Sequence, residues 1–304
     1  MKVGISVSSS YQSRDVVEGA RFMIERTRVA RDAELDSLFL GDHHITPTPY
    51  YQNVPMLGRL LAEWSDRPTG VLLLLPLWNP VLAAEQLASL ACLSKGRLIM
   101  QCALGAGHAQ FQGMGARLKS RVKSFEASLA IMKRLWRGET VTAEGEWKIK
   151  NARISPLPPA SIEVWIGASA DKALDRVARL GDAWLADPGL NFNQLQFKLD
   201  VYQQALKRHG KKLPETLALR RDIYVAESAR DAAQVRAASI KSNYRGIAPE
   251  SLLIGEAGAI ASALLELEEA GFTDVIIRNL HPEQTKALQS TERLAEVRRL
   301  VASR

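Results

Sequence analysis

The stretch GVLLLLPLWNPVLAAEQLASLACLSKGRLIMQCAL, residues 70–104, decides the fold class. It begins with a short apolar run, continues through an alanine- and leucine-rich segment of helical length, and returns to a second apolar run at RLIMQCAL. Short apolar runs without polar alternation are typical of strands that are buried on both faces, as in parallel sheets. A strand, a helix and a second strand in this order predict a parallel βαβ unit.

The same alternation extends along the whole chain. The predicted strands are KVGISVS from residue 2, DSLFLG from 36, GVLLLLP from 70, RLIMQCAL from 97, EVWIGA from 163, AWLA from 183, LRRDIYVA from 219 and DVIIR from 274. Amphipathic segments of helical length separate them, and a last one follows the eighth strand. The pattern predicts an α/β fold, a (β/α)8 TIM barrel, as a single domain over residues 1–304. An open doubly wound sheet is the competing architecture.

One segment interrupts the alternation between the fourth and fifth βα units. It reads RGETVTAEGEWKIKNARISPLPPAS and is rich in turn residues near its end. Its alternating pattern around Gly145 predicts a β-hairpin insertion, followed by a proline-rich return to the barrel.

Composition and charge exclude several classes of protein. The chain is 46% hydrophobic and 24% charged, which is ordinary for a folded globular protein. Its longest apolar run, GVLLLLPLW, is far shorter than the roughly 20 residues of a membrane span. The start, KVGISVSSS, lacks the pattern of a signal peptide, so we expect a cytoplasmic protein. The net charge of +7 is spread among acids in helical segments, which predicts solvated helix faces and neither nucleic-acid nor membrane binding.

The residues after the second predicted strand are the first candidates for chemistry, because barrel active sites lie at the carboxyl ends of the strands. Asp42, His43 and His44 stand there, in a chain with five histidines. Neighbours in an extended chain point to opposite sides, so one histidine is expected to face the pocket as a general base or hydrogen-bond donor. Alternatively, both histidines only stabilise the loop, and the carboxylate of Asp42 forms a hydrogen bond with one of them. His108 and His281 lie near other strand ends without metal-site spacing, so no metal is expected.

Two glycine-containing turns follow the fourth and fifth strands. ALGAGHAQ is a weak match to a dinucleotide fingerprint, and Gly105 is expected to allow a tight loop close to a ligand. In VWIGASADKALDRVA the strand is predicted to end at Ile166, with a turn at Gly167 and Ala168 and a helix that begins at Ser169. Free amides beside a serine hydroxyl are suited to a phosphate. The alternative is that Ser169 is an ordinary helix N-cap.

With these pieces in place, the chain resembles the bacterial luciferase-like flavin-dependent oxidoreductase family along nearly its whole length. The resemblance is carried by RVARDAELDSLFLGDHH, LLLLPLWNPVLAAEQLASLACLSKGRL, FQGMGARLKSRVKSFEASLAIMKRLWRGETVTAEGEW and PLPPASIEVWIGASADKALDRVARLGDAW. It implies a (β/α)8 barrel, a flavin at the carboxyl ends of the strands with its phosphate at the fifth strand-to-helix turn, and often a homodimer.

The resemblance also assigns roles to residues. His43 resembles the family's active-site histidine beside the reactive flavin edge, in a motif usually written E-H-H. Ser169 falls where the family's serine meets the flavin phosphate, and Val71 and Leu72 fall where a non-proline cis peptide commonly supports the isoalloxazine ring. Luciferases proper carry a reactive cysteine and an arginine at the positions that match Ala103 and Leu104 of this chain, so light emission is not expected. The implied cofactor-binding residues are Asp42, Val71, Leu72, Gln101, Ala103, Gly105, Gly167, Ala168 and Ser169.

The function implied by the resemblance is a monooxygenase that uses reduced FMN and O2 on a small organic substrate. Because no convincing nicotinamide site is present, a separate flavin reductase is expected to supply the reduced FMN, and His43 to stabilise or protonate the oxygen intermediate. Within the family, the alternative is hydride transfer with the deazaflavin F420, in which His43 assists proton transfer. A flavin-binding barrel without turnover and a metal-dependent hydrolase are the alternatives from other classes.

Overall fold

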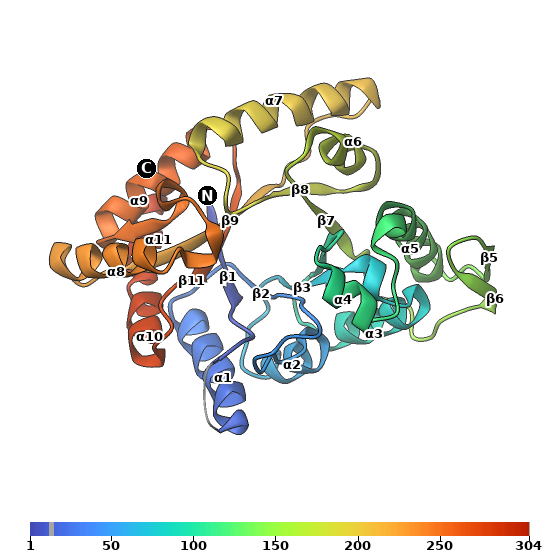
Figure 1. The fold of residues 1–304 in the computed structure, drawn as a ribbon, viewed down its shortest axis with the longest axis horizontal. Coiled ribbons are helices and arrows are strands. Elements are labelled where there is room, and N and C mark those ends of the chain that lie inside the picture. Colours follow the sequence, from blue (N-terminus) through green and yellow to red (C-terminus); the bar gives the residue numbers. More distant parts are fainter. Residues whose placement is uncertain (12–14, 304) are drawn as a thin grey trace. The chain divides into compact units, whose positions relative to one another are not determined.

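The computed structural model describes residues 1–11 and 15–303, and the chain divides into two compact units. The first unit comprises residues 1–8, 20–39 and 165–304, and the second comprises residues 9–19 and 40–164. Both contain parallel strands joined through helices (Figure 1).

The first unit contains the strands from both ends of the chain. They are β1 (Lys2–Val7), most of β2 (Ser37–Leu40) and of β7 (Glu163–Ala168), β8 (Ala183–Ala186), β9 (Leu217–Val225), β10 (Leu253–Gly255) and β11 (Asp274–Asn279). Its helices are most of α1 (Val16–Asp32), α6 (Asp171–Leu180), α7 (Phe192–Arg208), α8 (Ala229–Lys241), η3 (Tyr244–Gly246), η4 (Pro249–Ser251), α9 (Ala257–Glu269), α10 (Gln284–Glu292) and α11 (Leu294–Ala302). Strands β7, β8, β9, β11 and β1 pair successively in parallel.

The second unit is built around the βαβ stretch. Its elements are α2 (Asn53–Leu60), β3 (Thr69–Leu74), η1 (Leu75–Leu77), α3 (Pro80–Leu93), β4 (Leu98–Ala103), α4 (His108–Gly113), η2 (Leu118–Ser120), α5 (Arg121–Trp136), β5 (Val141–Glu144) and β6 (Lys148–Ala152). Strands β3 and β4 pair in parallel from Thr69 opposite Leu98 to Leu74 opposite Ala103. Strands β5 and β6 form a separate antiparallel pair.

The strand order confirms the predicted fold class. It runs β10-β9-β11-β1-β2-β3-β4-β7-β8, and β8 also pairs with β9, which is the order of a (β/α)8 barrel with β10 as an extra strand beside β9. All eight predicted barrel strands are present. The three-residue β10 was not predicted, because so short a run carries no periodic signal.

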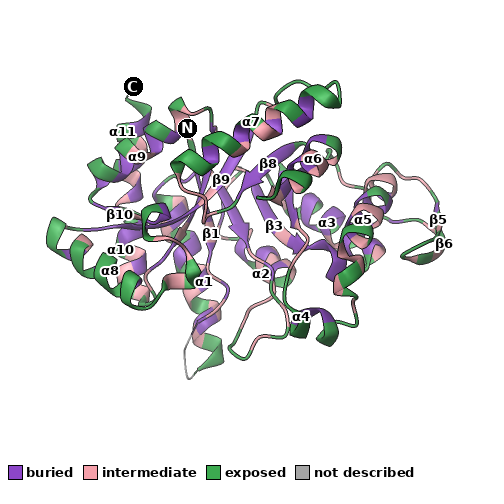
Figure 2. Ribbon diagram, turned by 45° about the horizontal axis from the view of Figure 1, so that its top comes forward, coloured by how far each residue is buried: buried purple, intermediate pink, exposed green. Residues whose placement is uncertain are grey.

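Burial explains why these segments form strands and helices. Figure 2 shows strands that are mostly buried and helices whose outer surfaces are exposed. In the βαβ stretch, Asn79 caps α3 by accepting hydrogen bonds from the backbone N–H groups of Val81 (2.9 Å) and Leu82 (3.2 Å), and Pro80 occupies the first turn. Within residues 1–11 and 15–303, no helix is long and apolar enough to cross a membrane.

Candidate active site

Asp42 ties the loop after β2 to the end of β3. Its side chain is buried, and its Oδ2 accepts hydrogen bonds from the backbone N–H of Leu74 (2.7 Å) and from Nε1 of Trp78 (2.8 Å). A buried carboxylate oxygen that accepts two N–H groups fixes the backbone around it, while Oδ1 of the same carboxylate accepts no hydrogen bond from the described residues. The acid of the predicted motif is therefore a residue that positions the loop.

His44 belongs to the same support. Its Nε2 lies 3.1 Å from Oδ1 of Asp42, and its ring meets that of Trp78 edge to face, with 5.7 Å between the centroids. Its backbone N–H donates to Oε1 of Gln110 at 2.8 Å. These contacts engage both the ring and the backbone, so His44 holds the loop.

His43 has a different environment. Its residue is exposed, its carbonyl accepts a hydrogen bond from Nε2 of Gln52 (3.3 Å), and its ring lies edge-on to Tyr50 at 5.9 Å. Within the described part of the chain, no hydrogen bond engages the imidazole nitrogens of His43. Of the two neighbouring histidines, His43 is therefore the one whose ring is available for chemistry.

The carboxyl ends of β3 and β4 lie beside this loop. Leu72 pairs with Gln101 and Leu74 with Ala103, and Nδ2 of Asn53 donates to the carbonyl of Leu72 at 2.5 Å. Val71 and Leu72 lie inside β3, and among the described residues the cis peptide bond is Ser155–Pro156. The cis bond that the resemblance implied at Val71 and Leu72 is therefore wrong. These two residues instead continue a regular parallel ladder.

Gln101 carries an unsatisfied donor. The side chain is 6% exposed, and its Nε2 has no hydrogen-bond partner among the described residues. An amide N–H buried without a partner costs free energy, so native structures leave such groups mainly where a ligand or water completes them. The carboxamide of Gln101 is thus suited to donate to a bound molecule.

Gly105 follows β4 in the left-handed region, with φ of 69°. A Cβ there would lie 3.4 Å from the Phe111 ring and 3.5 Å from Cβ of Leu74, the residue whose N–H binds Asp42. Glycine therefore suits both the backbone conformation and the close packing at this strand end.

The turn between β7 and α6 departs from the prediction. The strand continues through Gly167 to Ala168, and α6 begins at Asp171 with Ala170 at the N-cap position. Gly167 and Ala168 are thus strand residues, and the carbonyl of Ala168 accepts a hydrogen bond from Nε1 of Trp184 (2.9 Å). The predicted helix start at Ser169 is wrong, as is its alternative role as N-cap. Ser169 is exposed and precedes the N-cap residue Ala170 of a helix that lacks a side-chain cap.

The structure thus brings part of the predicted site together. In the second unit the predicted residues lie on the paired strands β3 and β4 and on the loops that follow β2 and β4; they are Asp42, His43, Leu72, Gln101, Ala103 and Gly105. Gly167, Ala168 and Ser169 belong to the first unit. The supports Asn53 and Gln110 were missed, since a single amide side chain in a helix gives no sequence signal. Among residues 1–11 and 15–303, no group of three or more metal-ligating side chains forms a metal site.

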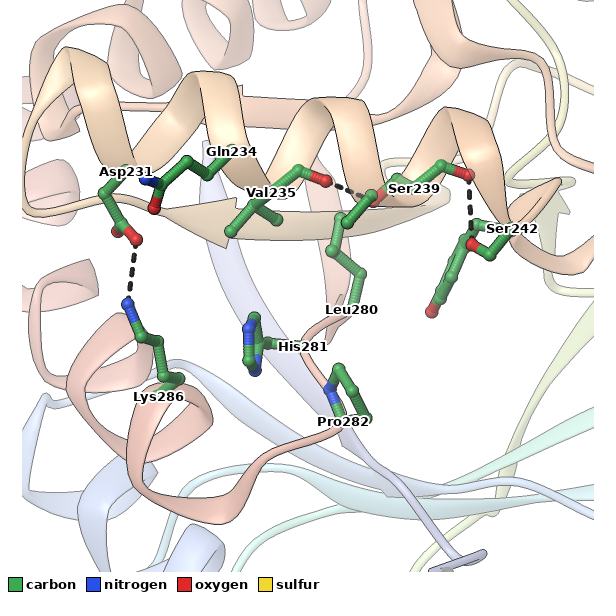
Figure 3. A pocket seen from close by; sticks show the side chains of 11 residues that line it. Asp231, Gln234, Val235, Ser239, Ser242, Leu280, His281, Pro282 and Lys286 are labelled. Atoms are coloured by element: carbon green, nitrogen blue, oxygen red, sulfur yellow. Dashed lines mark hydrogen bonds and ion pairs between the residues drawn. The ribbon is translucent and has the colours of Figure 1, made fainter.

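A separate pocket of about 540 Å3 lies in the first unit between α8 and the segment after β11 (Figure 3). Its polar side chains are largely engaged with the protein. Nζ of Lys286 lies 2.9 Å from Oδ1 of Asp231, and the hydroxyl of Ser239 donates to the carbonyl of Val235. The ring of His281 projects between these walls. It is tilted against the ring of Tyr224, with 5.4 Å between the two ring centroids.

The pH dependence of stability should report on His281. Burial lowers the pKa of His281 below 6.5, with Lys286 acting in the same direction and the carboxylates of Glu283 and Asp231 opposing it. Below pH 6.5 the unfolded chain therefore binds more protons than the native chain, so stability falls as pH decreases through this range. In urea unfolding between about pH 7.5 and pH 5, His281→Gln should flatten this decline. The matched variant His209→Gln, at an exposed ion pair with Asp175, should retain it; equal slopes for wild type and His281→Gln would refute the assignment.

Comparison with known proteins places the chain in a family. The family described as luciferase-like monooxygenase matches residues 1–276, and the chain belongs to it. The F420-dependent glucose-6-phosphate dehydrogenase of Mycobacterium avium (strain 104) is 27% identical over 204 residues, which cover 62% of this chain and 58% of that protein. The chain thus spans little more than half the length of this curated relative.

Two solved structures share the fold. The FMN complex of the oxygenating constituent of 3,6-diketocamphane monooxygenase from Pseudomonas putida, a type II Baeyer-Villiger monooxygenase, superimposes with a TM-score of 0.81 at 16% identity, covering 97% of each chain. An F420-dependent secondary alcohol dehydrogenase, bound to an F420-acetone adduct, superimposes with a TM-score of 0.80 at 16% identity, covering 99% of this chain and 98% of that one. The fold is thus shared with one protein solved with FMN and with one solved with an F420-acetone adduct.

Proposed function

We propose that this protein is a flavin-dependent oxidoreductase, a monooxygenase that uses reduced FMN and O2 on a small organic substrate. The observation that carries the proposal is the contrast between the two histidines, because the ring of His44 packs against Asp42 and Trp78, whereas His43 is exposed and its ring nitrogens make no hydrogen bond with the described residues. An exposed imidazole at a barrel strand end is suited to proton transfer near neutral pH.

The residues fit a flavin-type cofactor. The buried, unsatisfied Nε2 of Gln101 would donate to a ring carbonyl, and Gly105 leaves the backbone free of a side chain at the adjoining loop. Within the first unit, and considered by themselves, the exposed Ser169 and the uncapped N–H groups of α6 are suited to hold a phosphate group. When bound, such a cofactor supplies the electrons of the reaction. His43 would hold or donate the proton, and Asp42 and His44 would keep its loop in place.

A second candidate is F420-dependent hydride transfer without oxygen. The curated relatives favour it, because the proteins that match part of this chain are F420-dependent glucose-6-phosphate dehydrogenases. His43 would then assist proton transfer to or from the substrate. A separate flavin reductase would be required by the monooxygenase and not by the second candidate.

Binding titrations separate the two candidates. FMN, reduced FMN and F420 would be titrated into purified protein, and oxygen consumption would be followed with reduced FMN under air. Tight binding of reduced FMN with substrate-dependent oxygen consumption is the expected result. If F420 binds and hydride exchange is insensitive to oxygen, the second candidate replaces the monooxygenase. If none of the three cofactors binds, both candidates are refuted.

A further inference from the structure

A cluster of arginines lies on one face of the paired strands β9 and β11. Arg220 and Asp222, two residues apart on β9, point to the same side, and Arg278 on β11 stands opposite Asp222 in register. Nε of Arg278 donates to the hydroxyl of Ser8, just past the end of β1, at 3.3 Å. Arg245, from η3, reaches Oδ2 of Asp222 at 2.7 Å. Four separate segments of the first unit thus converge here.

The cluster has more positive than negative charge. Asp222 is fully buried and accepts hydrogen bonds from Arg220 (3.3 Å), Arg245 (2.7 Å) and the hydroxyl of Tyr244 (3.0 Å). Burial by itself raises the pKa of Asp222, but Arg220, Arg245 and Arg278 together hold it below its ordinary value. Asp222 is therefore ionised, and one carboxylate faces three guanidinium groups. Two positive charges remain without a counter-charge inside the cluster, which is costly where solvent is partly excluded.

Arg220 also has an unused donor. Its Nε is inaccessible to solvent and has no hydrogen-bond partner among the described residues, although a fifth of its side chain remains exposed. Arg220 makes its bond to Asp222 through NH2 alone, at 3.3 Å. Guanidinium groups bind planar and tetrahedral oxyanions through two parallel N–H groups, so this unused edge is suited to an anion.

The position of the cluster indicates which molecule would supply that anion. Arg278 and Ser8 lie at the carboxyl ends of β11 and β1, the end at which barrel enzymes bind their substrates. Strand β8 separates β9 from β7, whose turn to α6 is the proposed phosphate site of the cofactor. We infer that Arg220, Arg245 and Arg278 bind an oxyanion of the organic substrate, a carboxylate, sulfonate or phosphate. This inference rests on the proposed function and adds the substrate class.

Calorimetric titration of the cofactor-free protein with phosphate, sulfate and acetate tests the site directly. Wild type should bind at least one of these anions with one-to-one stoichiometry. Arg278→Met and Arg245→Met should each weaken that binding about 10- to 100-fold, because each removes a charge-assisted hydrogen bond, and Arg278→Lys should fall between. The matched control Arg208→Met, at an exposed ion pair with Asp175, should bind as wild type does. Absence of anion binding, or unchanged affinity in both folded variants, would overturn the inference.

Cofactor titrations on the same variants distinguish the two sources of an anion. Arg278→Met should bind FMN and F420 with wild-type affinity, since the cluster is assigned to the substrate. A parallel loss of cofactor affinity would assign the cluster to the cofactor and overturn the inference. If wild type binds neither cofactor while phosphate or sulfate still binds at Arg278, the proposed function fails and the anion site stands.

Discussion

The His43→Ala variant is expected to lose turnover by about 100- to 10,000-fold, the usual contribution of a positioned general acid or base. Its affinity for the reduced cofactor should remain close to that of wild type, because the ring of His43 supports no hydrogen bond within the described chain and its loop is held by Asp42 and His44. The measurement is steady-state turnover of the cofactor and substrate pair identified by titration, together with cofactor binding. Loss of the ring should therefore lower kcat with little change in the dissociation constant.

Two further histidine variants sharpen this test. His209→Ala, on the surface at Asp175, should leave turnover unchanged. His44→Ala should lower thermal stability together with turnover, because its ring packs against Trp78 and Asp42. Wild-type turnover in a folded His43→Ala protein would remove His43 from the mechanism. A larger loss in His44→Ala at unchanged stability would transfer the role to its neighbour.

The alternation of apolar runs and amphipathic segments was enough to predict the barrel. Strand β3, TGVLLL, is mostly apolar because both of its faces are covered. Such a run can be recognised in the sequence before its neighbouring strands are known. The helix start after β7 was mislocated by two residues, because strand β7 continues through Gly167 and Ala168 beside β8. Sheet pairing here overrides the turn tendency of a small-residue pair.

The charged cluster could not have been predicted, because its contacts are far apart in the sequence. Arg220 and Asp222 stand within a segment that reads only as a strand, and Arg245 comes from a short helix more than twenty residues later. The expectation that basic residues lie on solvated helix faces is wrong for Arg221, which is 3% exposed and donates to the carbonyls of Pro188 and Leu190. Composition gives the net charge of a chain and not the burial of its individual charges.

The loop after β2 was expected from the sequence to carry the site, and the contacts that support it were not. The two histidines were expected to divide into a residue for chemistry and a residue for the loop. His44 packs against Asp42 and Trp78 and His43 against Tyr50, and the division of roles between them stays a prediction. What could not be predicted is that Asp42 accepts from the backbone of Leu74, thirty-two residues later. A backbone N–H has no sequence signature, so only the folded structure shows that the acid joins two strand ends.

The second large effect expected is on stability, in Asp42→Ala. Removal of the carboxylate leaves the buried N–H of Leu74 and the indole N–H of Trp78 without an acceptor and removes the contact with His44. Each unsatisfied buried donor costs about 1–3 kcal/mol, so the free energy of unfolding should fall by about 3 kcal/mol. Urea denaturation at neutral pH measures this change, and the exposed ion-paired Asp32→Ala should change it by less than about 0.5 kcal/mol.

The conservative variant Asp42→Asn tests the reason for that loss. Its Oδ1 could replace the carboxylate oxygen that accepts from Leu74 and Trp78, while its Nδ2 would face Nε2 of His44, an acceptor in one neutral tautomer. Asp42→Asn should therefore lose less than half of the stability that Asp42→Ala loses. If both variants lose equally, the charge of Asp42 and not its pair of accepted hydrogen bonds holds the loop, and if neither loses stability, Asp42 does not hold the strand ends together.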